Sequence, residues 1–315
     1  MIKYATILKM NQKTSIITVS CIRDLPMLEL QGQSIFNFLD KTCPVYIVVN
    51  EDETDNWFDY FNKNVRHYYQ NHNLTIFTKQ EFVSNWAQWI PHQLNPWAVG
   101  WETQQVLKLL VSLKIRTPQY LILDSQNFLI KDWTPSIYDS KKVPARPGHF
   151  VMPTDIWNDY STSLGVKYAQ PSSETMSMCT PIFVDTTAVK ELVHEFGGET
   201  RFASWFKSAS KIKSEFILYL LWLEKIGGFG RYHRMYTVPE DWGNPMLRDC
   251  NSVEDFNFFF EKIGIHHTHA WVSINHRAWG NMTSDQYNLL NAKLATYKLC
   301  PKFDEYRALY VDLKF

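Results

Sequence analysis

The chain has 315 residues, and its 32 Lys and Arg residues balance 32 Asp and Glu residues, so the formal net charge is zero. With 45% hydrophobic and 20% charged residues, it is too apolar to be intrinsically disordered, and its neutrality argues against binding to nucleic acid or an anionic membrane. The length suits one large domain or two small ones.

Cysteine and targeting patterns favour a cytoplasmic location. The chain has 5 cysteines and no C-x-x-C pair, so neither a disulfide framework nor a structural zinc site is expected. Residues 1–13 lack an apolar run of signal-peptide length. No stretch of about 18 apolar residues predicts a transmembrane helix. A reducing compartment fits this pattern.

The first half of the chain alternates strand and helix patterns. Apolar, β-branched runs predict strands at Ser15–Ser20, Val45–Val49, Leu74–Phe77 and Tyr120–Leu123. Apolar spacing between them predicts helices at Met27–Leu39, 54–68, Gln80–Ile90 and Thr103–Leu113. Apolar strands separated by helices are typical of a parallel sheet covered on both faces. We therefore expect the α/β doubly wound class, which binds ligands at the carboxyl ends of its strands.

The pattern loosens after residue 133. Residues 134–180 hold several Pro and Ser residues and few periodic segments, which favours a long excursion over a site. Further strands are expected at Pro181–Val184 and Ala270–Ile274, and helices at Ala188–Phe196, Ser214–Lys225, Val253–Ile263 and Asp285–Tyr297. The tail Tyr306–Phe315 is expected to add an edge strand or to pack over the core.

Asp124 follows the strand Tyr120–Leu123 and begins the tetrapeptide Asp-Ser-Gln-Asn. A carboxylate at the carboxyl end of a parallel strand faces the ligand site, where it can hold a divalent metal that neutralises a diphosphate leaving group. Asp, Ser and Asn are also ordinary turn residues. The residue types alone leave both interpretations open.

The segment Gly100–Leu110 precedes that strand, and its spacing places Gln105, Lys108 and Ser112 on one helix face. A lysine among apolar neighbours suits a phosphate. A solvated surface lysine is the more common outcome, and the segment by itself favours that interpretation.

Together these segments resemble the nucleotide-sugar-dependent glycosyltransferases of the GT-A fold. More closely, they are similar to a poorly characterised bacterial and viral glycosyltransferase-like family with G-W-x-x-Q-Q-x-x-K-L, D-S-D and S-E-Y-x-x-Y blocks. The matching pieces run in order over residues 15–280 and are SIITVSCIRDL, VYIVVNED, GWETQQVLKL, YLILDSQNFLIKD, KSEFILY and VSINHRAW.

This resemblance implies a GT-A-like (Rossmann-like), mostly parallel central sheet flanked by helices. Residues 1–133 would form the nucleotide-sugar-binding half, and residues 134–315 the acceptor-binding half of the same domain. The implied activity is hexosyltransferase-like transfer from a nucleotide diphosphate sugar, such as a UDP-sugar, to a hydroxyl of a carbohydrate acceptor. A role in cytoplasmic glycan biosynthesis and a bacterial or viral origin fit the resemblance.

The resemblance also assigns roles to particular residues. Asn50 and Asp52 would lie near the base or ribose, because an acidic group can accept hydrogen bonds from ribose hydroxyls. The donor-binding positions implied are Ser20, Arg23, Asp24, Asn50, Asp52, Gln105, Lys108 and Arg277. Glu215 is the candidate base that deprotonates the acceptor hydroxyl. The alternative explanation is an acidic residue in the first turn of a helix, where acids are favoured.

The predicted metal site departs from the family pattern. The family has Asp-Ser-Asp where this chain has Gln126 in the third position, and an amide oxygen can ligate Mn²⁺ or Mg²⁺ but brings no charge. Asp124, Gln126 and His276 are the predicted ligands, and Arg277 would hold the diphosphate. The outcomes left open are weaker metal affinity, metal-free catalysis helped by Lys108 and Arg277, or a degenerate binding protein.

Three alternatives stay open. The pair His267 and His269 has a spacing compatible with zinc, although no third ligand is indicated. A nucleotidyltransferase can share the architecture but usually has a Gly-rich first loop, and Ser20–Leu25 contains no Gly. A catalytically inactive glycan- or nucleotide-binding protein would explain Gln126.

Overall fold

The computed structural model describes residues 14–86, 96–134, 142–145, 147–148, 154–167, 175–176, 179–208, 214–235, 246–247, 250, 252–265 and 270–302. Within these ranges, the side chains at 96–99, 147–148, 154–156, 175–176, 207–208, 264–265 and 276 lie outside the description. None of the helices in the described ranges combines the length and hydropathy needed to cross a bilayer.

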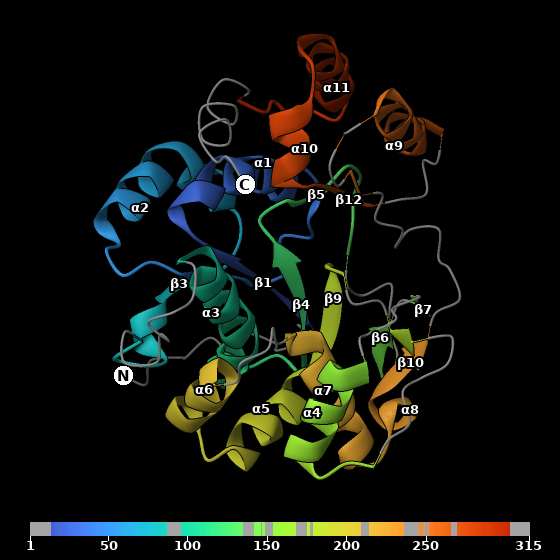
Figure 1. Cartoon of the computed structure of the whole chain (residues 1–315). Coiled ribbons are helices and arrows are strands. Elements are labelled where there is room, and N and C mark those ends of the chain that lie inside the picture. The colour runs from blue at the N-terminus through green and yellow to red at the C-terminus, as the bar shows by residue number, and fades with distance from the viewer. Residues whose placement is uncertain are drawn as a thin grey trace, which may run out of the picture.

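A five-stranded sheet forms the centre of the fold, in the order β3-β2-β1-β4-β9 (Figure 1). Its strands are β1 (Thr14–Ser20), β2 (Val45–Val49), β3 (Leu74–Thr78), β4 (Gln119–Asp124) and β9 (Ile182–Asp185). The first four run parallel, and β9 pairs antiparallel with β4. The predicted α/β class with a mostly parallel sheet flanked by helices is confirmed.

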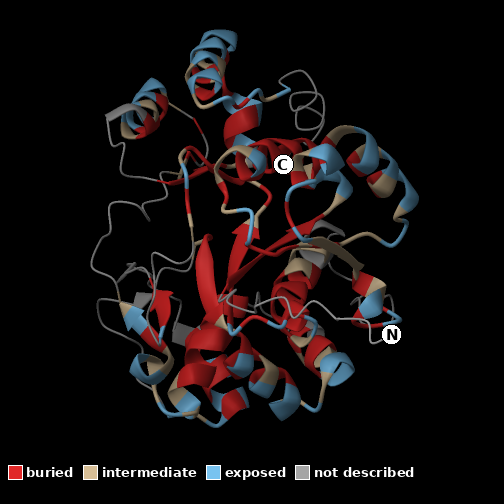
Figure 2. Ribbon diagram, turned by 180° about the vertical axis from the view of Figure 1, so that it is seen from behind, coloured by how far each residue is buried: buried red, intermediate tan, exposed pale blue. Residues whose placement is uncertain are grey.

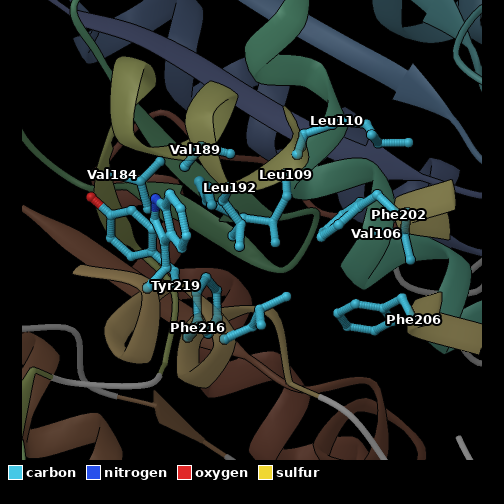
Figure 3. Packing of buried hydrophobic residues seen from close by; sticks show 14 of the residues in the cluster. Val106, Leu109, Leu110, Val184, Val189, Leu192, Phe202, Phe206, Phe216 and Tyr219 are labelled. Atoms are coloured by element: carbon cyan, nitrogen blue, oxygen red, sulfur yellow. The ribbon is translucent and has the colours of Figure 1, made fainter. Parts of the chain in front are cut away.

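Alternate residues of each strand point to opposite faces, and both faces are buried. On one face, Ile17, Val19 and Ile122 pack with helices α3 (Pro96–Leu110), α4 (Thr154–Leu164), α5 (Thr186–Glu195), α6 (Glu199–Ser208) and α7 (Glu215–Lys225). Figure 3 shows the part of this core that lies among α3, α5, α6 and α7. On the other, Ile16 and Leu121 pack with α1 (Leu25–Phe38) and α2 (Asp55–Tyr60). This double coverage explains why the strand sequences are continuously apolar. In Figure 2 the central strands are mostly buried, whereas the edge strand β3 is intermediate.

Smaller elements surround the sheet. The strands β5 (Asn127–Leu129), β12 (Trp271–Ile274) and β11 (Met246–Leu247) form a three-stranded sheet beside α9 (Val253–Ile265), α10 (His276–Asn281) and α11 (Ser284–Thr296) (Figure 1). Two further strand pairs are present. β6 (Val143–Ala145) pairs with β10 (His233–Met235), and β7 (Pro147–Gly148) pairs with β8 (Thr175–Met176). The short helix α8 (Phe229–Tyr232) directly precedes β10.

The predicted helix at Gln80–Ile90 is wrong over its described part. Only a 3-10 turn at Lys79–Glu81 forms there. The Lys79 ammonium lies 2.8 Å from Asp52, and Trp86 Nε1 donates to the carbonyl of Lys79 at 2.9 Å. These side-chain interactions fold the segment back on itself and prevent a continuous helix. Residues 87–90 lie outside the described ranges.

Other differences concern helix positions. Helix α3 begins at Pro96, not Thr103, in keeping with the preference for proline in a first helical turn. Helices α4 and α6 were not predicted, and α4 lies in the stretch 134–180 that we expected to be irregular. The tail Tyr306–Phe315 lies outside the described residues.

Candidate active site

Three parallel strands bring their carboxyl ends to the same edge of the sheet. Ser20 at the end of β1 pairs with Val49 of β2, and Val19 pairs with Asp124 at the end of β4. The loops that follow begin at Cys21, Asn50 and Ser125, and we call this edge, with Ser20, Asn50 and Asp124, the carboxyl edge. Sheets of this class place their ligands here.

Asp124 is held at the carboxyl edge by partners on both of its carboxylate oxygens. Its Oδ1 lies 2.8 Å from Nζ of Lys108, and its Oδ2 accepts a hydrogen bond of 2.7 Å from Thr180 Oγ1. Thr180 lies just before β9, the antiparallel neighbour of β4. The Asp124 side chain is 26% exposed, so part of the carboxylate reaches solvent while its orientation is fixed.

The turn that carries Asp124 is held by buried side chains from other elements. Asn127 Oδ1 accepts from the Asp124 N–H at 2.7 Å, and Asn127 Nδ2 donates to Ser273 Oγ. Gln31 of α1 donates to the carbonyls of Asp124 and Asn127, each at 2.9 Å. Its Oε1 accepts from Thr18 of β1 at 2.8 Å. A fully satisfied buried network of this kind gives a rigid turn.

Sequence reasoning missed Gln31, Asn127 and Thr180. Gln31 is 1% exposed in a largely apolar helix, and a polar residue inside an apolar pattern was the available signal, since buried polar groups need hydrogen-bond partners. Thr180 carried no comparable signal, because it meets Asp124 only through the pairing of β9 with β4.

Lys108 lies between two carboxylates. Its Nζ is 2.8 Å from Asp124 and 3.1 Å from Oε1 of Glu215, at the start of α7. The side chains of Lys108 and Glu215 are 4% and 2% exposed. The sequence therefore located three interacting residues, Lys108, Asp124 and Glu215, but it did not indicate that the lysine would pair with both acids.

Gln105 joins the same cluster from one turn earlier on α3. In the amide orientation that gives both side-chain atoms of Gln105 a hydrogen-bond partner, the Gln105 nitrogen donates to the Glu215 carboxylate. The Gln105 oxygen then accepts from Trp101 Nε1 at 3.0 Å. The hydroxyl of Tyr120 on β4 donates to the carbonyl of Lys108 at 3.1 Å, which ties α3 to the sheet. The predicted face of α3 thus points inward, and its lysine is not a solvated surface residue.

The pKa values in the cluster depend on one ammonium and two carboxylates that lie close together and largely away from solvent. Burial by itself would lower the pKa of Lys108, but the charges of Asp124 and Glu215 raise it above its usual range. Burial raises the pKa of Glu215, and Lys108 only partly offsets this. With all three groups ionised the cluster carries one net negative charge, and the raised pKa of Glu215 means that it takes up a proton more readily than a solvated glutamate.

The loop after β1 is held by acidic side chains. Asp24 accepts from the Cys21 N–H at 3.0 Å, and Glu51 from the Ile22 N–H at 2.5 Å. Burial raises the pKa of Asp24. Arg23 in this loop is exposed.

Three predicted donor-binding residues, Ser20, Asn50 and Asp52, differ in burial and in hydrogen-bond partners. Ser20 is buried, and its hydroxyl accepts a 3.4 Å bond from Trp57 Nε1. Asn50 donates to the carbonyl of Gly100 at 3.0 Å, which links the loop after β2 to α3. Asp52 is exposed and pairs with Lys79. Asn50 therefore lies at the carboxyl edge beside α3, whereas Asp52 pairs with Lys79, which directly follows the carboxyl end of β3.

The late His-Arg block lies next to the Asp124 turn. The N–H of Ile274 at the end of β12 donates to the carbonyl of Gln126 at 3.3 Å. His276 and Arg277 open helix α10, which is capped by the Asn275 side chain accepting from the Arg277 N–H at 3.0 Å. Arg277 is exposed. The side chain of His276, and the whole of His266–His269, lie outside the description.

The described residues do not fit a divalent metal at Asp124. Both Asp124 oxygens already have partners, one of them an ammonium that opposes a second cation, and Gln126 is neutral. Within the described ranges, no three His, Cys, Asp or Glu side chains converge as a metal site. The expectation of Mn²⁺ or Mg²⁺ with Asp124, Gln126 and His276 as ligands stays a prediction.

Comparison with solved structures relates this architecture to glycosyltransferases. The apo structure of the bifunctional glycosyltransferase WbbM shares 14% identity at a TM-score of 0.51, covering 95% of this chain and 52% of that one. The chain thus spans about half the length of WbbM. An active-site mutant of LgtC has 10% sequence identity and a TM-score of 0.45, and the match covers 94% of this chain and 99% of LgtC. Apo GlyE of Streptococcus pneumoniae TIGR4 has 8% identity and a TM-score of 0.45, and the match covers 95% of this chain and 64% of GlyE.

The likeness to WbbM shows a shared fold, and it agrees with the GT-A-like class expected from the sequence. No curated protein matches the chain by sequence. Residues 11–273 match a protein family described as a family of unknown function, DUF6492. Because this match spans most of the chain, the protein belongs to the DUF6492 family.

Proposed function

We propose that the protein is a glycosyltransferase that uses a nucleoside diphosphate sugar, with a UDP-sugar as the first candidate, and a carbohydrate hydroxyl as acceptor. The observation that carries the proposal is Asp124, clamped by Lys108 and Thr180 at the carboxyl edge of a GT-A-like sheet. The fold shared with WbbM, a glycosyltransferase by its printed name, supports the same class.

In this proposal, residues 1–133 bind the donor and residues 134–315 bind the acceptor. Asp24 and Asn50 lie on the nucleoside side of the carboxyl edge, and Arg23 is exposed in the loop beside them. The buried Ser20, whose hydroxyl accepts from Trp57, supports that loop from the end of β1. Arg277, exposed at the start of α10 next to the Asp124 turn, holds diphosphate oxygens through a bidentate guanidinium. Charge placed where the leaving diphosphate develops is the main way such a site accelerates transfer.

The proposal is tested by combining a binding screen with a turnover assay. Thermal unfolding is followed with UDP, UDP-glucose, UDP-galactose, UDP-N-acetylglucosamine and GDP-mannose, each with Mn²⁺ and with chelator. A ligand at 100 times its Kd stabilises the folded state by about 2.7 kcal/mol, so binding appears as a raised Tm. Release of nucleoside diphosphate is then measured for each ligand that binds.

Asp124→Asn keeps the shape of the side chain but removes its charge, which breaks the ion pair that holds it to Lys108. We expect turnover to fall by about 10²-fold or more, the size typical of a small misplacement of groups in an active site. Asp132→Asn is the matched control, because Asp132 is an exposed acid near the end of the same block. No Tm shift with any nucleotide would contradict the proposal. Binding without release in any metal condition would instead identify an inactive binding protein, as Gln126 suggests.

A further inference from the structure

Glu215 is the most deeply buried charge at the carboxyl edge. Its side chain is 2% exposed and that of Lys108 is 4% exposed, whereas that of Asp124 is 26% exposed. Lys108 contacts both acids, so the three form a chain in which Asp124 reaches solvent and Glu215 ends in the interior. Glu215 therefore offers much less surface to a substrate than Asp124 does.

The carboxylate of Glu215 is fixed from several elements. Lys108 and Gln105 of α3 bind it. The preceding Ser214 is held by α4, because its N–H donates to the Tyr160 hydroxyl at 2.6 Å. The α7 segment that follows Glu215 is buried. This amount of support is typical of a residue that orients its neighbours.

Lys108 depends on this support for its own position. Its ammonium lies between the two carboxylates and 5.5 Å from the centroid of the Phe216 ring. Among the described residues, the charged or titratable groups that face the cluster include Glu102 of α3, Tyr160 of α4 and Asp24 in the loop after β1, whose carboxyl interacts with that of Asp124. Removing Glu215 leaves the ammonium held by Asp124 alone, and the two side chains are then free to shift together.

We propose that Glu215 is a positioning residue that fixes Lys108, and that Lys108 in turn fixes the carboxylate of Asp124 at the carboxyl edge. The role rests on the proposed function, because Asp124 is the group that faces the donor there. A general base must reach the acceptor hydroxyl directly or through one water. In this proposal the Glu215 carboxylate, which is 2% exposed and bound to Lys108, supports the site and leaves the role of base to another group.

Two substitutions at Glu215 separate positioning from proton transfer. Glu215→Gln keeps an oxygen that can accept from Lys108, whereas Glu215→Leu does not. Positioning predicts that E215Q retains turnover within about tenfold of the original chain, that E215L loses far more, and that the acidic limb of the pH profile of kcat/KM persists in E215Q. A base predicts equal, large losses in kcat for both and the disappearance of that limb, and this result would overturn the inference.

The matched control is the surface pair Lys225 and Glu195, in which the ammonium and carboxylate are also in contact but the side chains are 33% and 46% exposed. Glu195→Gln and Glu195→Leu are expected to leave turnover unchanged. A loss of turnover with E195L as large as that with E215L would show a general effect of surface charge, and the inference would fail.

A stability measurement tests the coupling without activity. Urea unfolding is compared for Lys108→Met, Glu215→Gln and the double variant. Lys108→Met leaves a buried carboxylate without its cation, so adding E215Q should restore part of the lost stability. Additive effects would show that the two side chains are not coupled, and would overturn the inference. If no nucleotide sugar binds the unaltered chain, the proposed function fails. The comparison of the two single variants with the double variant then still decides whether Lys108 and Glu215 are coupled.

Discussion

His233 on β10 is a buried histidine with fixed partners. Its Nε2 lies 2.8 Å from the Tyr219 hydroxyl, which itself accepts from the N–H of Asp185 at 2.8 Å. The Phe229 ring stacks on the imidazole with centroids 4.8 Å apart. Burial lowers the pKa of His233 to about 3, so the ring is neutral in the folded protein. This chain of contacts joins α7 to β9 and β10.

The depressed pKa of His233 predicts acid sensitivity. The unfolded histidine binds its proton near pH 6.5, so the stability it contributes is full above that pH and is lost as pH falls toward 3. The slope reaches about 1.4 kcal/mol per pH unit for one proton. We expect His233→Gln to lower stability at pH 7 and to flatten this slope in urea unfolding measured from pH 7 to pH 4.

His194→Gln is the control for that experiment, because His194 is exposed near the end of α5. It should leave the pH dependence of stability as it is. An unchanged slope in H233Q would show that other groups cause the acid sensitivity.

At the scale of elements, α1 holds two different parts of the molecule through two glutamines. Gln31 binds the turn at Asp124 and Asn127. Gln33 donates to the carbonyl of Cys300 at 3.1 Å and accepts from its N–H at 2.7 Å. Both are buried, at 1% and 6% exposure. One helix therefore supports the proposed site with one side chain and the segment after α11 with the other.

Gln31→Met and Gln33→Met form a matched pair. Gln31→Met leaves the carbonyl of the buried Asn127 without this partner, and we expect a loss of about 1–3 kcal/mol in urea unfolding. Gln33→Met affects the backbone of the exposed Cys300, which water can reach, so its loss should be smaller. Gln31→Met should also reduce nucleotide-sugar turnover at temperatures where the variant is folded, because the Asp124 turn shifts. Gln33→Met should not. Equal turnover in the two variants would show that the Gln31 contacts do not position Asp124.

At the scale of the whole molecule, stability comes from apolar packing on both faces of the sheet. Figure 3 shows the part of the core where α3, α5, α6 and α7 meet, with Phe202 among its labelled residues. The described tryptophans Trp157 and Trp222, each 4% exposed, belong to this core, and Trp279, at 0% exposure, belongs to the cluster beside the three-stranded sheet.

Phe202→Ala and Phe258→Ala test this account with identical chemistry in two environments. Phe202 is 0% exposed and Phe258 is 65% exposed. Removing a buried phenylalanine ring costs about 3–5 kcal/mol, so F202A should show a large drop in urea stability. F258A should stay within about 0.5 kcal/mol of the original chain, as surface changes usually do. Similar losses would show that α9, which carries Phe258, is covered in solution.

The sequence by itself determined the fold class and the order of the main elements. Continuous apolar runs such as Val45–Val49 and Tyr120–Leu123 are local signals, and they identified strands buried on both faces. It also placed Asp124 at the end of a parallel strand. It was wrong for Gln80–Ile90, where the pairing of Lys79 with Asp52 replaces helix with a turn.

Only the tertiary structure decided the partners within the proposed site. Lys108 and Glu215 are 107 residues apart and Gln31 and Asp124 are 93 apart, and no local periodicity encodes such contacts. The packing of α3, α7 and β4 brings two carboxylates to one ammonium and buries them. An ionised group leaves water only where a partner compensates its charge. Glu215 can therefore be buried because it pairs with Lys108, whereas Asp124, at the end of its strand, keeps part of its side chain in contact with solvent.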